Sequence, residues 1–347
     1  MLNNMKRIFS FILLMAVFSI VSAEKYYISI DVLQPGDITF SSSVAHLLLV
    51  NNTANQPHAF GHSIEVEGQK TLVEQNTDSL PLFILASMQE ELETIGFFST
   101  VQLVDDTQNS DGSFYAISRL TSQEVDSLCN VYGADAVLAL NRIAMTDQIT
   151  CTYDEYSSAW SAALDVTSLA SWSLHYPNNR TVVNKHYADT LYWQTDDDNL
   201  QHAYDLLPDR GDAEVDVALL AGANTVKRIL PAWQRTERYF YTNKNKRILQ
   251  GMDSISYQKW DAALAIWKDL HQDASKITQA YAAANVAVIY ELKGDYTTAI
   301  QWVEKACALA GAAWNATLNG SFLQEQTNYL KQLHQRQRDE ELLKQQL

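Results

Sequence analysis

The chain has 347 residues with a formal net charge of −16, and 47% of its residues are hydrophobic. This length allows two domains, and this composition lets each of them bury a core, which excludes a chain that is disordered throughout. An acidic surface repels nucleic acid and anionic lipid, because both are bound through cationic contacts, so the composition argues against a nucleic-acid-binding protein.

Residues 1–23 have the pattern of a secretory signal peptide. Lys6 and Arg7 precede the apolar run IFSFILLMAVFSIV, and Val21 and Ala23 supply the small residues of a cleavage site. The alternative is a membrane anchor, but the apolar run is shorter than the roughly 20 residues that span a bilayer. The sequence therefore predicts an exported protein that is soluble or held peripherally at a membrane.

Residues 24–242 are expected to form an α/β domain with a mixed sheet. A first strand is expected in residues 25–40, ended by the Pro35-Gly36 turn signal, and the next strands are expected over residues 44–53, 101–106 and 134–145. The second and the fourth of these segments are continuous apolar runs, which is typical of strands buried on both faces. Helices are expected over residues 79–98, after Ser79 as N-cap, and over residues 121–133, where Thr121 and Glu124 form a capping box.

Two alternating segments and a closing helix complete this domain. Residues 163–176 and 181–193 place apolar side chains on one face each, which predicts an antiparallel hairpin with one buried side. A helix is expected over residues 214–233. Residues 234–249 then lead into the C-terminal part, with residues 239–246 as a packed joint.

The order of these elements, with the run ADAVL before a buried strand, resembles the small α/β domain of bacterial envelope assembly factors. These are the curli secretion lipoprotein, the activators of penicillin-binding proteins and the N-terminal domain of TolB. The chain also resembles uncharacterised Gram-negative envelope proteins whose start is similar to YISIDVLQPGDITF. The resemblance implies a periplasmic or outer-membrane-associated protein, but no cysteine for a lipid anchor stands at Ala23-Glu24.

Residues 243–347 are expected to form helical hairpins with a capping helix. In YELKGDYTTAIQWVEKA, small residues and aromatics recur where two antiparallel helices meet, and Gly294 ends the first helix. This run resembles the second half of a tetratricopeptide repeat. An earlier copy, YQKWDAALAIWKDL, places Ala263 36 residues before Ala299, against a repeat period of about 34. The predicted fold is therefore an α/β domain followed by an all-α repeat domain.

The resemblance to tetratricopeptide repeats implies a peptide-binding surface. The residues that would face the concave side of the repeats are Tyr281, Asn285, Val288 and Glu291. Asn285 stands where such repeats often use asparagine to hydrogen-bond a peptide backbone or a terminal carboxylate. The alternative is that Asn285 is a solvent-exposed helix residue.

No catalytic, metal or cofactor site is predicted. His58 and His62 flank a glycine in HAFGH and are expected to lie in a loop without a metal ion. The acidic run at residues 196–198 lacks the spacing of a calcium loop. Cys129 and Cys151 could pair in an oxidising compartment, although small apolar core residues are the alternative that we favour.

Aromatic residues are concentrated between the hairpin and the expected domain junction. They are Trp160, Trp172, Tyr187, Trp193, Trp233 and the run Tyr239-Phe240-Tyr241. Such residues can form a carbohydrate or peptide platform, but more often they seal a contact between domains.

The sequence thus predicts a non-enzymatic envelope adaptor, without a cofactor, that binds an envelope protein or peptide through its repeats. The alternatives are a glycan-binding module that uses the aromatic hairpin, or an enzyme accessory whose functional residues are scattered along the chain.

Overall fold

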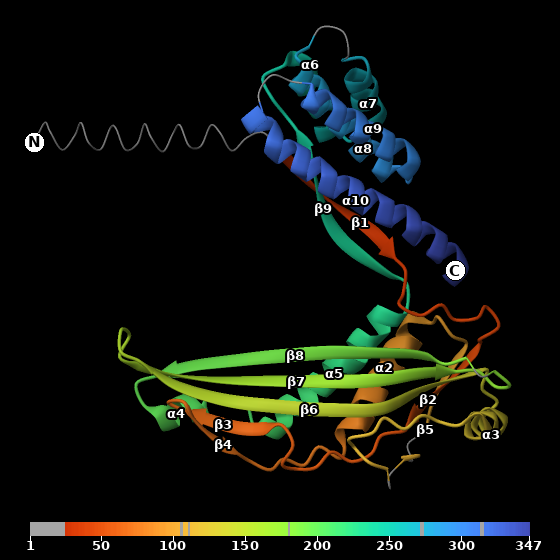
Figure 1. Cartoon of the computed structure of the whole chain (residues 1–347), viewed down its shortest axis with the longest axis vertical. Coiled ribbons are helices and arrows are strands. Elements are labelled where there is room, and N and C mark those ends of the chain that lie inside the picture. Colours follow the sequence, from red (N-terminus) through yellow and green to blue (C-terminus); the bar gives the residue numbers. More distant parts are fainter. Residues whose placement is uncertain (1–24, 105–106, 110–111, 180, 271–273, 313–315) are drawn as a thin grey trace, which may run out of the picture. The chain divides into compact units, whose positions relative to one another are not determined.

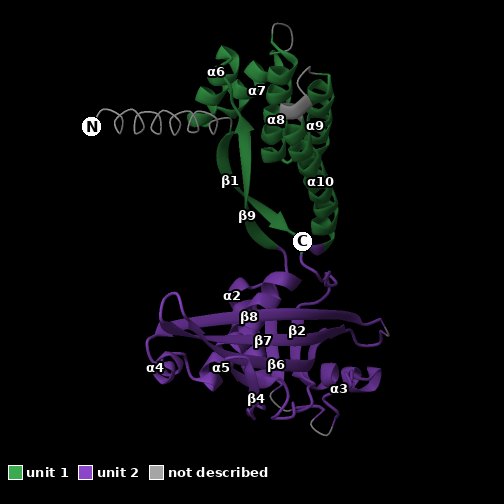
Figure 2. Cartoon of the chain, turned by 60° about the vertical axis from the view of Figure 1, so that its left-hand side comes forward, with its two compact units in different colours: residues 1–35, 232–345, 347 green, residues 36–231, 346 purple. Residues whose placement is uncertain are grey.

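The structure is a computed structural model, and it describes residues 25–104, 107–109, 112–179, 181–270, 274–312 and 316–347. The predicted signal peptide lies outside the described residues. The chain forms two compact units (Figure 2): unit 1 comprises residues 1–35, 232–345 and 347, and unit 2 comprises residues 36–231 and 346. Within the described residues, no helix combines the length and the apolar character that crossing a membrane requires.

Unit 2 is built on a seven-stranded mixed sheet. Its strands are β2 (His46–Asn51), β3 (His62–Val66), β4 (Gln69–Leu72), β5 (Thr100–Val104), β6 (Ala136–Asp154), β7 (Ala159–His175) and β8 (Val183–Asp197). The order is β4-β3-β6-β2-β5, and β7 and β8 extend from β6 as an antiparallel meander (Figure 1). The predicted hairpin of β7 and β8 is confirmed.

Strand β6 connects the two halves of this sheet. Its start pairs in parallel with β2, and its later residues pair in parallel with β3. The register with β7 shifts between Leu140 and Arg142, which marks a bulge at Asn141. An inserted residue bends a strand, which allows the long strand β6 to pair first with β2 and then with β3.

Helices cover β2 on both faces. The helices of unit 2 are α2 (Leu80–Ile95), α3 (Ser122–Tyr132), α4 (Leu200–Asp205) and α5 (Arg210–Ile229), of which α4 packs against β7 and β8. Leu47 and Leu49 belong to the main core with α2 and α5, whereas Leu48 and Val50 pack in a second cluster with α3. The prediction that this strand is buried on both faces is therefore confirmed. The capping box of Thr121 and Glu124 is present at the start of α3.

Unit 1 contains a ribbon of two strands that are distant in sequence. Strand β1 (Lys25–Gln34) pairs antiparallel with β9 (Ala232–Tyr241), so that Lys25 lies opposite Tyr241 and Gln34 opposite Ala232. The sequence predicted β1 but missed β9, and the expected closing helix ends earlier, at Ile229. Because β1 and β9 pair only with each other, the compact units divide at residues 35/36 and 231/232, whereas the expected boundary was 242/243.

The rest of unit 1 is helical, as expected for the C-terminal region. Its helices are α6 (Lys246–Ser256), α7 (Trp260–Lys268), α8 (Lys276–Leu292), α9 (Tyr296–Gly311) and α10 (Ala316–Gln346). Helix α6 packs against α7, and α8 packs against α9. Ala287 of α8 and Ala299 of α9 share a buried cluster with Leu333 of α10. The small side chains allow close approach of the helices.

Gly251 is expected to be required where α6 meets α7. A Cβ atom at this position would lie 2.1 Å from Nε1 of Trp267, whose side chain is fully buried. Alanine in a helix interior normally gains about 0.5–1 kcal/mol over glycine, but overpacking costs about 1–3 kcal/mol. Gly251→Ala should therefore lower the free energy of unfolding measured in urea.

Gly320 in α10 provides the matched control. A Cβ there would meet no atom within 4 Å, so Gly320→Ala should be neutral or stabilising. Equal stabilities of the two variants would show that Trp267 can move aside, and that the close contact of α6 with α7 is not required.

Candidate peptide-binding site

The four predicted peptide-binding residues lie on α8, and strand β9 of the same unit packs against them. Tyr281 stacks on Tyr241 with ring centroids 4.8 Å apart. Val288 is buried in one cluster with Phe240, and Glu291 binds a residue of β9. The face that was expected to contact a partner is therefore occupied by a segment of the chain itself.

Asn285 makes the contact with the extended backbone that its position suggested. Its Oδ1 accepts a hydrogen bond from Tyr241 N at 2.7 Å, and its Nδ2 donates to Tyr241 O at 2.8 Å. The side chain is fully buried, which excludes the alternative of an exposed helix residue. The amide holds β9, and a role in holding a separate peptide stays a prediction.

Glu291 takes part in a buried ion pair. Arg238 Nε donates to Oε2 at 2.7 Å, and Arg238 Nη2 donates to Oε1 at 2.8 Å. The hydroxyl of Tyr329 on α10 donates to Oε2 at 2.7 Å. This bidentate arrangement satisfies both carboxylate oxygens and joins β9, α8 and α10. Glu291 is therefore committed to the structure of the unit.

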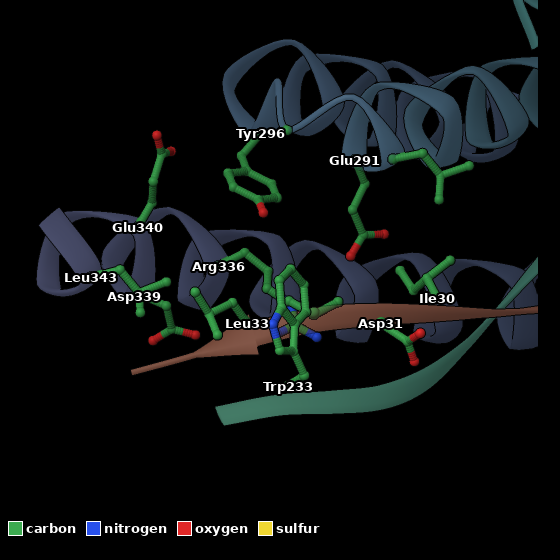
Figure 3. Close-up of a pocket in the computed structure, with 13 residues that line it drawn as sticks. Ile30, Asp31, Leu33, Trp233, Glu291, Tyr296, Arg336, Asp339, Glu340 and Leu343 are labelled. Carbon is green, nitrogen blue, oxygen red and sulfur yellow. The ribbon is translucent and has the colours of Figure 1, made fainter. Parts of the chain in front are cut away.

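A cavity of about 240 Å³ lies beside this network, and we call it the Trp233 cavity (Figure 3). It is lined by residues of β1, β9, α8, the α8–α9 turn, α9 and α10: Ile30, Asp31, Val32, Leu33, Trp233, Glu291, Leu292, Gly294, Tyr296, Arg336, Asp339, Glu340 and Leu343. Trp233 is 72% exposed. A large exposed aromatic side chain beside a cavity is the type of residue that dominates binding energy at interfaces.

Tyr296 and Arg336 are the polar residues of the Trp233 cavity that have the fewest partners. Burial raises the pKa of the Tyr296 phenol, while the charge of Arg336 opposes this rise. The phenol therefore keeps its proton at neutral pH and can donate a hydrogen bond. Sequence reasoning missed Arg336, because α10 lacks a repeat motif. It assigned Tyr296 only to packing beside the turn between the two helices, because β9, which completes the cavity, was not recognised as a strand.

A second cavity, of about 210 Å³, lies between β9, α8 and α10. Val288, Tyr239 and Glu325 are among its lining residues. Glu325 accepts hydrogen bonds from Tyr241 Oη at 2.6 Å and from Lys25 Nζ at 2.6 Å. Its polar groups are thus largely engaged with one another.

Unit 2 contains a buried cluster of ionisable groups that the sequence did not indicate. His62 was expected in a loop, but it is fully buried in strand β3, so this expectation is wrong. His62 Nδ1 lies 2.5 Å from Asp147 Oδ2 and 3.4 Å from Glu214 Oε1. Arg210 Nη1 lies 2.7 Å from Asp147 Oδ1. Burial, followed by the hydrogen bond and charge of Asp147, raises the pKa of Glu214 to about 8.

His62, Asp147 and Glu214 offer potential metal ligands within 4.8 Å of one another, but their hydrogen bonds do not fit a metal ion. Gln56 accepts from Met145 N and donates to Met145 O, which fixes its amide orientation. Its Nε2 lies 3.1 Å from His62 Nε2, so Nε2 of the ring is the acceptor and Nδ1 carries the hydrogen. With Arg210 already beside Asp147, a network of protein charges fits this cluster better than a metal centre does.

The remaining candidate residues are dispersed. Cys129 is buried in the cluster with α3, and Cys151 in the main core. Both are free thiols. The predicted aromatic concentration divides between the units, because Trp172 lies in the core of unit 2, whereas Trp233 and Tyr241 belong to unit 1.

Two family models match the chain. A family described as "Domain of unknown function (DUF8603)" matches residues 44–241, and one described as "Domain of unknown function (DUF6340)" matches residues 250–335. No curated protein matches the chain. Among solved structures, the crystal structure of a Helicobacter pylori protein, described as a neuraminyllactose-binding hemagglutinin homolog, is 9% identical with a TM-score of 0.25. The match covers 63% of this chain and 93% of that chain, and so weak a likeness supports no inference.

Proposed function

We propose a function for this chain, which belongs to the family described as Domain of unknown function (DUF8603): it is a non-enzymatic adaptor of the bacterial cell envelope. Unit 1 would hold a segment of a partner protein, and the helix pairs α6–α7 and α8–α9 would be tetratricopeptide-like repeats. The pattern of residues 1–23 supports export. The resemblance of the α/β region to envelope assembly factors supports a periplasmic or outer-membrane-associated location.

The observation that carries this proposal is the exposed Trp233 at a cavity that the chain leaves open. The inner face of α8 is occupied by β9, so a partner would bind at the Trp233 cavity. There Leu33 and Leu292 add apolar walls beside the indole. The two hydrogen bonds of Asn285 to the backbone of β9 support the same proposal, because they are the type of contact that would hold an extended peptide.

The lining of the cavity favours binding over catalysis. The residues around the Trp233 cavity include no serine, cysteine or histidine, so they cannot supply the Ser–His or Cys–His pair of nucleophilic catalysis. The acids and bases that remain are carboxylates and Tyr296. Glu291, a buried carboxylate of this lining, is held by Arg238 and Tyr329. A carboxylate held in this way is not poised to exchange protons with a substrate.

Peptide display on the full chain tests the proposal. One library presents random peptides with free C-termini, and a second presents them with blocked C-termini. We expect an enriched consensus in at least one library, with its binding reduced at least tenfold by Trp233→Ala. The control Tyr156→Ala alters a side chain that is 98% exposed in unit 2, and it should leave binding unchanged.

Failure of both libraries to enrich any sequence would overturn the adaptor proposal. Saturable quenching of Trp233 fluorescence by oligosaccharides, lost in Trp233→Phe, would favour the glycan-binding alternative in its place.

A further inference from the structure

Arg336 of α10 is a buried cation without a partner. The residue is 8% exposed, and its Nη1 atom is buried without a hydrogen bond. Among the described residues, no carboxylate lies within ion-pair distance of its guanidinium. Removing a charge from water is costly unless a counter-ion compensates for it. The position therefore lacks an anionic group.

The carboxylates around the cavity are already engaged elsewhere. Glu291 binds Arg238, and Asp31 Oδ1 lies 3.1 Å from Arg235 Nε. Asp339 accepts a hydrogen bond from Gln335 at 2.7 Å, and Glu340 lies 3.3 Å from Lys344. Arg336 is thus the cation of this site that remains available to a ligand.

The Tyr296 hydroxyl is a second donor of the cavity without a partner. The described residues give it no hydrogen bond, and Figure 3 shows the ring directed from the start of α9 toward the region of Trp233 and Arg336. A guanidinium and a phenol that converge on one cavity are suited to a carboxylate, which accepts hydrogen bonds at both oxygens. The surrounding acidic residues would repel a doubly charged phosphate more strongly than a single carboxylate.

The size of the cavity limits the ligand. Its volume of about 240 Å³ falls below the roughly 300–1,000 Å³ of sites that enclose a drug-sized molecule. One end of a chain fits this space better than a whole ligand does. Leu33, Trp233 and Leu343 provide apolar surface for a side chain next to the carboxylate.

We propose that the Trp233 cavity binds the C-terminal carboxylate of a partner polypeptide that ends in an apolar residue. Arg336 binds the carboxylate, Tyr296 donates a hydrogen bond to it, and the last side chain packs on Trp233 and Leu33. This assignment rests on the proposed adaptor function and names the part of the partner that the adaptor would recognise.

Calorimetric titration of the full chain tests the assignment with N-acetyl-leucyl-leucine and its C-terminal amide. We expect the acid to bind at least tenfold more tightly than the amide, and inorganic phosphate not to bind. Arg336→Met should abolish the preference for the acid. The matched control Arg235→Met removes a mostly exposed arginine of β9 and should keep the preference.

The stability of the Arg336→Met variant gives a second readout. Because this arginine has no counter-ion, its removal should leave the free energy of unfolding unchanged or increase it, whereas removal of a structural arginine would lower it. A clear loss of stability would contradict an unpaired guanidinium that is held ready for a ligand.

The remaining outcomes separate the two proposals. Equal binding of acid and amide, or failure of both to bind, overturns the carboxylate assignment, and enrichment in the blocked library then leaves the adaptor function standing. Binding of 4-methylvalerate as tightly as the dipeptide would overturn a polypeptide source and indicate a small carboxylic acid. Absence of enrichment in both libraries overturns the adaptor function itself.

Discussion

Arg238→Met is expected to lower the free energy of unfolding of unit 1 by about 3–5 kcal/mol, because it leaves the carboxylate of Glu291 buried without its counter-ion. Glu291 is 5% exposed and receives two hydrogen bonds from Arg238. The loss of stability can be measured by urea unfolding with hydrogen exchange of the α8 amides as the readout. These amides report on unit 1 separately from unit 2.

Two further variants give this prediction its control. Arg238→Met combined with Glu291→Gln removes both charges and retains an acceptor for Tyr329, so it should recover most of the loss. Arg235→Met breaks the exposed pair with Asp31 and should cost less than about 1 kcal/mol. If Arg238→Met and Arg235→Met cost the same, the buried pair does not hold β9 to α8.

Glu214→Gln is expected to remove a pH dependence of stability in unit 2. The folded pKa of Glu214 is about 8, and its ordinary value is 4.5. Between these values the folded protein keeps a proton that the unfolded chain has lost. The contribution of Glu214 to the free energy of unfolding is complete below pH 4.5 and is lost as the pH rises through 8. Over this range the free energy of unfolding falls by at most about 1.4 kcal/mol per pH unit. A glutamine side chain at this position has no proton to lose in this range, so the slope should disappear.

The measurement is the urea midpoint of both proteins between pH 5 and pH 9, at constant ionic strength. Glu214→Gln should match the parent near pH 5 and exceed its stability near pH 9. Other groups face Glu214, namely Asp147, His62 and Arg210, and they are unchanged in the variant. Glu155→Gln alters an exposed carboxylate of unit 2 and should keep the parent slope. An unchanged slope in Glu214→Gln would place the titrating group elsewhere.

The elements that local patterns specify were predicted well. The apolar run of β2, the capping box at Thr121 and the alternation of β7 and β8 each indicate their element within about ten residues of sequence. Strands β3 and β4 were missed, although Glu67 and Gly68 form a turn with positive φ between them. Strand β4 is exposed throughout, so it lacks the apolar alternation on which strand prediction depends.

The candidate site was predicted only in part, because its geometry depends on contacts that are distant in the sequence. Asn285 was predicted to hydrogen-bond the backbone of a partner peptide; its amide binds the backbone of β9 in the same chain, and binding of a partner stays a prediction. The strand that Asn285 binds is β9, and β9 is formed by pairing with β1, which lies about 200 residues away in the sequence. The same pairing brings Leu33 and Trp233 to Arg336. No local sequence pattern marks an arginine that is buried without a counter-ion in the folded unit.

The pairing of β1 with β9 also determines how late in synthesis unit 1 can be completed. Unit 2 is essentially one continuous segment inserted between the two strands of the ribbon. As the chain emerges from the ribosome, the inserted segment can fold before β9 is available to pair with β1. The Trp233 cavity is complete only after α10, which follows all its other lining elements in the sequence, has been synthesised. A truncated or stalled product would therefore carry the inserted segment without the Trp233 cavity.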